Sequence, residues 1–259
     1  MSWWGKAIGS GVGFMMGGPL GAIIGATFGH RIDQGLGGAG RLNIGDTERT
    51  QAAFFSATFS LMGYLAKADG KVSASEISMV EQVMSNMRLL PEQRKAAIAL
   101  FNQGKKDDFP IADILDQFRR ECHRRSNLLQ MFLEILISTA LADGVLHSAE
   151  KKALYYMAQQ LGFNSVYVDQ LINMVGAQQH YADDSHQAAA SIDDAYMVLG
   201  IDVSVTDADM KRAYRRLMSQ HHPDKLVSKG LPEEMIRLAT KKTQEINAAY
   251  KQIKQSRKR

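Results

Sequence analysis

The stretch TDADMKRAYRRLMSQHHPDK, residues 206–225, decides the fold of the carboxyl-terminal region. Thr206 followed by Asp209 forms a capping box, which predicts that a helix starts here. Apolar residues at helical spacing form one stripe: Met210, Ala213, Tyr214, Leu217 and Met218. The opposite face carries four basic residues: Lys211, Arg212, Arg215 and Arg216. The stretch therefore predicts a basic amphipathic helix.

The tripeptide His222-Pro223-Asp224 follows this helix. The His-Pro step disfavours helical conformation at His222, so we expect the tripeptide to lie in a loop. Downstream, Pro232 suits the start of a second helix, whose apolar residues recur at helical spacing as far as Ile253. Two amphipathic helices joined by a loop of about ten residues pair antiparallel, apolar face to apolar face. The tripeptide is then expected to project beside the basic helix.

This region resembles the J domain of the DnaJ family. Four segments carry the resemblance: residues 194–200, 211–217, 222–224 and 245–250. In two respects the sequence departs from the family. Ala195 stands where the family usually has an aromatic residue, and we expect the family's fourth helix to be missing or vestigial because the chain stops at Arg259. We assign residues 192–259 to this domain.

The resemblance implies that the domain docks on a DnaK-type chaperone and stimulates its ATP hydrolysis, so that the chain itself is not an enzyme. A basic helix would complement an acidic partner surface. The residues implied to contact this partner are His222, Pro223, Asp224, Lys211, Arg212, Arg215 and Arg216. The sequence does not identify the client proteins.

The amino-terminal residues 1–31 carry an uncharged apolar segment with a glycine repeat. Residues 7–29 contain no charged side chain, and as a helix they would extend about 34 Å, enough to cross a bilayer core of about 30 Å. Glycine recurs at every fourth position: Gly5, Gly9, Gly13, Gly17, Gly21, Gly25 and Gly29. A transmembrane helix with this groove predicts a homodimer. A cleaved signal peptide and a flexible soluble arm are the alternatives.

Basic residues are more frequent after this segment than before it. Arg31, Arg41 and Arg49 follow the segment, whereas Lys6 precedes it. This bias favours a cytoplasmic carboxyl-terminal body, and with a DnaK-type partner it predicts a single-pass protein of a bacterial inner membrane. Residues 32–49 are rich in glycine and are predicted to form a tether.

The middle region, residues 50–178, is predicted to be a bundle of helices. The expected helices are residues 47–67, 73–88, 91–103, 110–124, 126–142, 147–161 and 164–177. An Ala-Asp-Gly turn followed by a glutamate occurs twice, 74 residues apart. This repeat resembles the TerB-like domain, which implies a protein-interaction or metal-associated role. Residues 179–191 are polar and are predicted to be a linker that lets the J domain move.

The repeated turns also raise the question of a metal site. Asp69, Glu76, Asp143 and Glu150 either converge on a cation or simply cap helices. The upstream ligands of an EF-hand are absent, and we expect neither a metal nor a cofactor. The single Cys122 excludes an intrachain disulfide.

The fold class predicted is all-α, with one transmembrane helix, a TerB-like bundle and a J-domain hairpin. The 259 residues carry a net charge of +4 and have a pI of about 9.1. This mild excess of positive charge does not lead us to predict a nucleic-acid partner. The main function predicted is a membrane-anchored co-chaperone. The alternative is a membrane scaffold whose middle domain binds a signalling protein or a metal.

Overall fold

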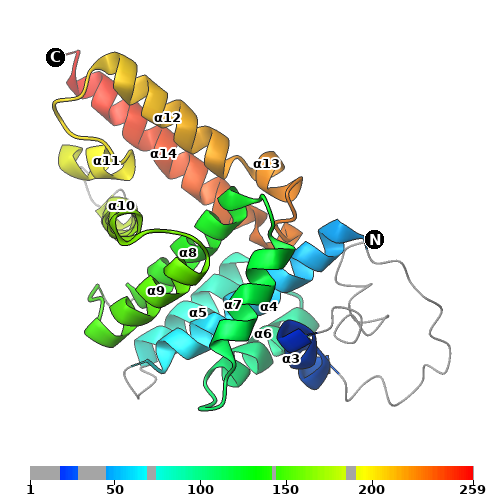
Figure 1. Cartoon of the computed structure of the whole chain (residues 1–259). Coiled ribbons are helices and arrows are strands. Elements are labelled where there is room, and N and C mark those ends of the chain that lie inside the picture. Colours follow the sequence, from blue (N-terminus) through cyan, green and yellow to red (C-terminus); the bar gives the residue numbers. More distant parts are fainter. Residues whose placement is uncertain (1–17, 29–44, 69–73, 142–143, 185–190, 259) are drawn as a thin grey trace.

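The computed structural model describes residues 18–28, 45–68, 74–141, 144–184 and 191–258. Within these ranges the secondary structure is helical and contains no strand, which confirms the predicted all-α class. The helices form a bundle, α4 to α10, and a carboxyl-terminal unit, residues 191–258, that extends from it as an arm (Figure 1).

The long helix α4 is the centre of the bundle. It spans Asp46–Ala66, and most of its residues are buried. It packs against α6 (Pro91–Gly104), α7 (Ile111–Glu121), α8 (Ser126–Ala140) and α9 (Ser148–Gln160). Helices α5 (Ala74–Asn86) and α10 (Ser165–Asp184) pack against α8. Phe54 of α4 meets Phe118 of α7 and Phe132 of α8 edge-on, with ring centroids 5.9 and 6.2 Å away. These fully buried aromatic rings tie three helices to one core.

Two glycines allow α4 and α6 to touch backbone to backbone. A Cβ atom on Gly63 would lie 1.9 Å from the carbonyl oxygen of Phe101, and one on Gly104 would lie 1.7 Å from that of Ser60. Neither position has room for a side chain, because the obstacle is main chain and cannot rotate away. The helix predicted over residues 91–103 extends to Gly104, and this glycine sets how closely the two helices approach.

The carboxyl-terminal unit is built on an antiparallel helix pair. Helix α12 spans Asp207–His221 and α14 spans Ile236–Ser256, and they lie side by side in Figure 1. Shorter elements complete the unit: α11 (Ile192–Val198), α13 (Pro223–Val227) and a 3₁₀ turn at Glu233–Met235. The predicted cap is present, since Thr206 Oγ1 accepts a hydrogen bond from the Asp209 backbone N–H at 3.1 Å. The core of the pair includes buried Met210, Ala213, Leu217, Ile246, Ala249 and Ile253.

Arg257, at the end of α14, closes the far end of this unit. Its guanidinium donates to the Tyr196 hydroxyl at 2.8 Å, pairs with Asp207 at 2.7 Å and donates to the Val203 carbonyl at 3.0 Å. One side chain thus joins α11, the loop before α12 and the end of α14. Charge-assisted hydrogen bonds of this kind hold short elements in place where little apolar surface is available.

The carboxyl-terminal unit packs against the bundle. Helix α10 contacts both α11 and α14, and α8 contacts α12. The predicted linker begins at residue 179, whereas α10 continues to Asp184. The later part of the predicted linker, residues 185–190, lies outside the described residues. Polar contacts between distant parts of the chain join the unit to the bundle.

Helix α3, Gly18–Phe28, comes from the predicted membrane segment. It lies against α6 and α7, and the backbone N–H of Leu20 donates to Gln117 Oε1 at 2.8 Å. Pro19 stands in its first turn, where proline is tolerated. Among the described residues, no helix combines the length and apolarity that crossing a membrane requires. The remaining residues of the predicted span, 7–17 and 29, lie outside the described ranges.

Candidate functional site

The tripeptide lies at the junction between two helices. Helix α12 ends at His221 and α13 begins at Pro223, with His222 between them in a non-helical conformation, φ −60° and ψ 123°. The expectation that the whole tripeptide lies in a loop is wrong: Pro223 and Asp224 form the first turn of a five-residue helix. The reason is local, because proline favours the first helical position and the preceding side chain caps the turn.

His222 is the side chain that caps α13. Its Nδ1 atom accepts a hydrogen bond from the Asp224 backbone N–H at 3.2 Å. The side chain of His222 is 47% exposed and that of Asp224 is 92% exposed. The imidazole edge and the carboxylate are therefore both available to a partner.

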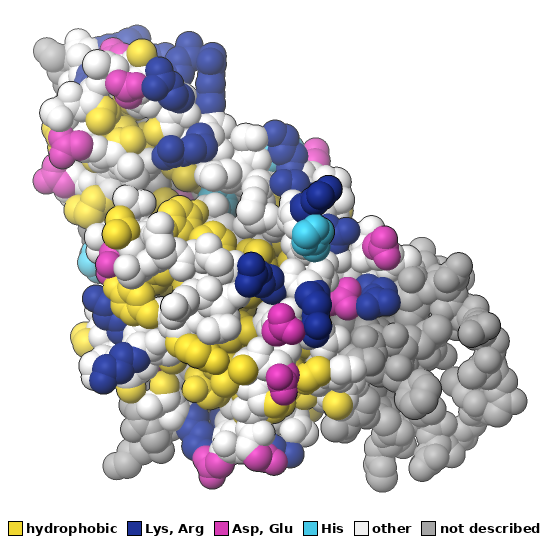
Figure 2. All heavy atoms as spheres, in the orientation of Figure 1, with side chains coloured by type: hydrophobic (Ala, Val, Ile, Leu, Met, Phe, Trp, Pro, Cys, Tyr) yellow, Lys and Arg dark blue, Asp and Glu magenta, His cyan; other side chains and the backbone are white. Residues whose placement is uncertain are grey.

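The four basic residues of α12 are exposed as predicted. Lys211, Arg212, Arg215 and Arg216 face solvent, while the apolar stripe of the same helix is buried or half-buried. Arg212 pairs with Asp209 at 3.1 Å. Tyr214 stacks on Tyr250 of α14, with ring centroids 4.2 Å apart. In Figure 2, Lys and Arg side chains are spread over the arm that carries α12 and α14.

Sequence reasoning missed a buried charged cluster directly beside the tripeptide. Lys242 Nζ lies 2.9 Å from Glu134 Oε2, and His221 Nε2 lies 3.5 Å from Glu134 Oε1. Burial alone would raise the pKa of Glu134, but the positively charged Lys242 and the hydrogen bond from Gln130 lower it, so the carboxylate stays ionised. Burial lowers the pKa of His221 and keeps the ring neutral at neutral pH. Helical periodicity marks such positions only as polar residues and cannot pair them across the chain.

Of the four acidic residues in the repeated turns, the structure describes the side chain of Glu150. Glu150 is buried, and its Oε2 accepts from the His147 backbone N–H at 2.9 Å, which is a capping interaction at the start of α9. Asp69 and Asp143 lie outside the described residues, and the side chain of Glu76 is not described. Within the ranges that the structure describes, no three His, Cys, Asp or Glu side chains cluster as metal ligands would.

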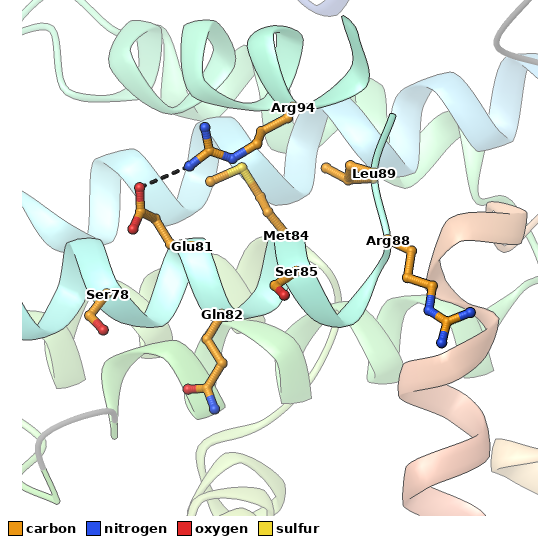
Figure 3. A pocket seen from close by; sticks show the side chains of 8 residues that line it. All are labelled: Ser78, Glu81, Gln82, Met84, Ser85, Arg88, Leu89 and Arg94. Carbon is orange, nitrogen blue, oxygen red and sulfur yellow. Dashed lines mark hydrogen bonds and ion pairs between the residues drawn. The ribbon is translucent and has the colours of Figure 1, made fainter. Parts of the chain in front are cut away.

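Two other features lie away from the tripeptide. Cys122 is fully buried, and burial raises the pKa of its thiol to about 12, which makes it inert. An open pocket of about 780 Å³ lies beside α5 and the start of α6 (Figure 3). Glu81 and Arg94 pair at its edge at 2.9 Å. None of the predicted site residues lines this pocket.

Comparison with known families agrees with the three regions. Residues 194–259 match the profile of the DnaJ domain, residues 55–173 match that of the tellurite resistance protein TerB, and residues 1–40 match the co-chaperone DjlA transmembrane domain. No solved structure matches the chain. The fold and the exposed His-Pro-Asp site thus define a J-domain protein, and the carboxyl-terminal unit is its J domain.

Curated relatives identify the family. The chain is 40% identical to the co-chaperone protein DjlA of Yersinia pestis, with 99% of each chain covered. It is 42% identical to DjlA of Shewanella oneidensis and 41% identical to DjlA of Escherichia coli K12, again with 99% of each chain covered. The chain belongs to the DjlA family of co-chaperones.

Proposed function

We propose that this chain is a co-chaperone that recruits a DnaK-type chaperone and stimulates its ATP hydrolysis. The observation that carries the proposal is the exposed tripeptide at the start of α13, beside the exposed basic face of α12. In this proposal the partner performs the hydrolysis and the chain contributes the contact that triggers it.

The roles of the individual residues follow from their geometry. His222 and Asp224 present an imidazole and a carboxylate within one turn, held by the hydrogen bond between His222 Nδ1 and the Asp224 backbone N–H. This hydrogen bond fixes the orientation of the imidazole, which can then contact a partner without losing much side-chain entropy. The cations of α12 would attract an acidic surface over a distance of about 8–10 Å at physiological salt and so speed the encounter.

Removing three exposed charges from α12 tests the docking role. In a Lys211→Ala, Arg215→Ala, Arg216→Ala variant, we expect the concentration of chain needed for half-maximal stimulation to rise about tenfold or more at low salt. Arg212 is left in place because it pairs with Asp209. The measurement is the steady-state ATPase rate of a DnaK-type chaperone against the concentration of the full-length chain in lipid nanodiscs, at several salt concentrations.

The matched control removes three charges from α14. Lys251, Lys254 and Lys258 are exposed, so their replacement by alanine lowers the net charge by the same amount. We expect this control to change the half-maximal concentration much less. Equal losses in the two variants would show that only net charge matters and would contradict docking through α12.

We also propose that the amino-terminal segment anchors the chain in a bacterial inner membrane, with the body in the cytoplasm and two copies associated through the glycine face. The match of residues 1–40 to a transmembrane domain and the basic residues after the segment support this. A segment that lies in the bilayer core cannot at the same time form the hydrogen bond between the Leu20 backbone N–H and Gln117 Oε1 of the bundle. Anchoring therefore requires α3 to leave the bundle.

Replacing Gly9, Gly13 and Gly17 by leucine tests this association. Two fragments of a cytoplasmic reporter enzyme, fused to the carboxyl terminus, should give activity in the wild type and about tenfold less in the variant, because leucine side chains would keep the helices apart. Gly21 is left unchanged because it is buried in α3. An intact reporter at the same position serves as the control for orientation. Full activity of the split reporter in the variant would refute association through this face.

A further inference from the structure

The J domain is held on the bundle by contacts that surround the tripeptide. We propose that Glu134, His221 and Lys242 form a latch that docks the J domain on the bundle in one orientation, and that the bundle thereby positions the His-Pro-Asp segment. Glu134 belongs to α8 of the bundle, whereas His221 and Lys242 belong to α12 and α14. The three side chains are positioning residues, since they lie behind the exposed segment and not on its surface.

The latch is a buried ion pair with a neutral histidine at its side. The side chains of Glu134, His221 and Lys242 are 3%, 2% and 11% exposed. Gln130 Nε2 donates a further hydrogen bond to Glu134 Oε1 at 2.8 Å. Glu134 Oε1 thus accepts a hydrogen bond, while Oε2 is held by the charge of the Lys242 ammonium and, among the described residues, has no hydrogen-bond partner of its own. Breaking such a buried pair by removing one partner leaves an uncompensated charge and is strongly destabilising.

The surroundings of the latch carry other charged and titratable groups. Glu245 of α14 faces Lys242, and burial raises the pKa of that carboxyl. Tyr167 of α10 is influenced by Glu134 and by Arg216 of α12, and burial raises the pKa of its hydroxyl to about 12. Tyr167 is therefore neutral at physiological pH, and the ionised pair at the centre is Glu134 with Lys242.

Further contacts join the two units on both sides of the tripeptide. Before it, Asn127 Nδ2 donates to the Gln220 carbonyl at 3.2 Å. After it, Gln51 Nε2 lies 3.5 Å from the Leu231 carbonyl. Gln93 Nε2 also donates to Glu234 Oε1, at 2.5 Å. The segment between residues 220 and 231 is thus tied to α4 and α8 at its two ends.

Gly230 allows the J domain and the bundle to approach each other closely at this interface. Gly230 has φ +98°, a conformation that side chains rarely adopt, and a Cβ atom there would lie 2.9 Å from Thr50 Cγ2 of α4. The bundle therefore approaches the main chain of the J domain directly after α13. Between these fixed points, His222 and Asp224 stay exposed, so docking orients the tripeptide without covering it.

Reversing each charge of the latch tests the proposal. Spin labels on cysteines introduced at Lys152 of α9 and Lys254 of α14, both exposed, report the distance between bundle and J domain in the full-length chain. Cys122 is buried and does not compete for the label. We expect one narrow distance distribution for the wild type. In Glu134→Lys and in Lys242→Glu we expect a broad distribution, with the docked fraction reduced about tenfold or more relative to the undocked one.

The double variant Glu134→Lys, Lys242→Glu restores opposite charges and should restore the narrow distribution. Asp113→Lys makes the same change of charge at an exposed position of α7 and should leave the distance unchanged. Circular dichroism checks that each variant keeps its helices. A narrow distribution in both single variants, a broad one in the wild type, or no recovery in the double variant would overturn the latch. Binding of a chaperone is not needed for this measurement, so its outcome is separate from that of the proposed function.

Discussion

Replacing Gly104 or Gly63 by alanine is expected to destabilise the bundle by about 3–5 kcal/mol, which is near the upper limit for single substitutions. In both cases the added Cβ atom would lie less than 2 Å from a backbone carbonyl oxygen of the facing helix. Relief requires α4 and α6 to move apart, and Phe101 and Leu100 beside the contact would lose their packing. Urea denaturation followed by circular dichroism of the full-length chain measures the loss.

Gly176 is the matched control for this prediction. It lies within α10, and a Cβ atom there would meet only Leu141 Cδ1 at 3.9 Å, an ordinary contact distance. Gly176→Ala should therefore leave stability unchanged or raise it by up to about 1 kcal/mol, because alanine favours helix over glycine. If Gly104→Ala behaved like Gly176→Ala, the close approach of α4 and α6 would be contradicted.

Most of the described helices could be predicted from local patterns, whereas the short helix α13 was not predicted. The expected starts at residues 91 and 126 are those of α6 and α8, and the Thr206 cap places the start of α12 at Asp207. Helical periodicity and capping act over about four residues, so the sequence displays them directly. The exposed basic face of α12 followed from the same periodicity.

Features that join distant residues could not be predicted in this way. Glu134 lies more than 80 residues before His221 and more than 100 before Lys242, and nothing in the spacing of the chain pairs them. The packing of the J domain against the bundle rests on such contacts. The close approach of α4 and α6 at Gly63 could not be predicted either, because the sequence does not reveal which helix packs against a glycine.

His222→Asn is expected to abolish the proposed stimulation of a DnaK-type chaperone while leaving the fold intact. The side chain of His222 caps α13 through Nδ1, and asparagine is among the best helix caps, so the short helix should persist. The exposed imidazole edge is lost, so a contact that depends on it disappears. We expect stimulation to fall at least about tenfold, since removing a central polar contact of an interface costs about 2 kcal/mol or more. The variant His222→Gln removes both the imidazole ring and the helix cap. Comparing it with His222→Asn separates the effect of the ring from that of the cap.

The most direct measurement is single-turnover ATP hydrolysis by a DnaK-type chaperone with saturating full-length chain, wild type against His222→Asn. Helical content and melting temperature of the variant, taken from circular dichroism, confirm that it is folded. The account predicts a clear acceleration by the wild type and a rate close to that of the chaperone alone with the variant. No acceleration by the wild type, or equal acceleration by both proteins, would contradict the assignment of the His-Pro-Asp segment as the trigger.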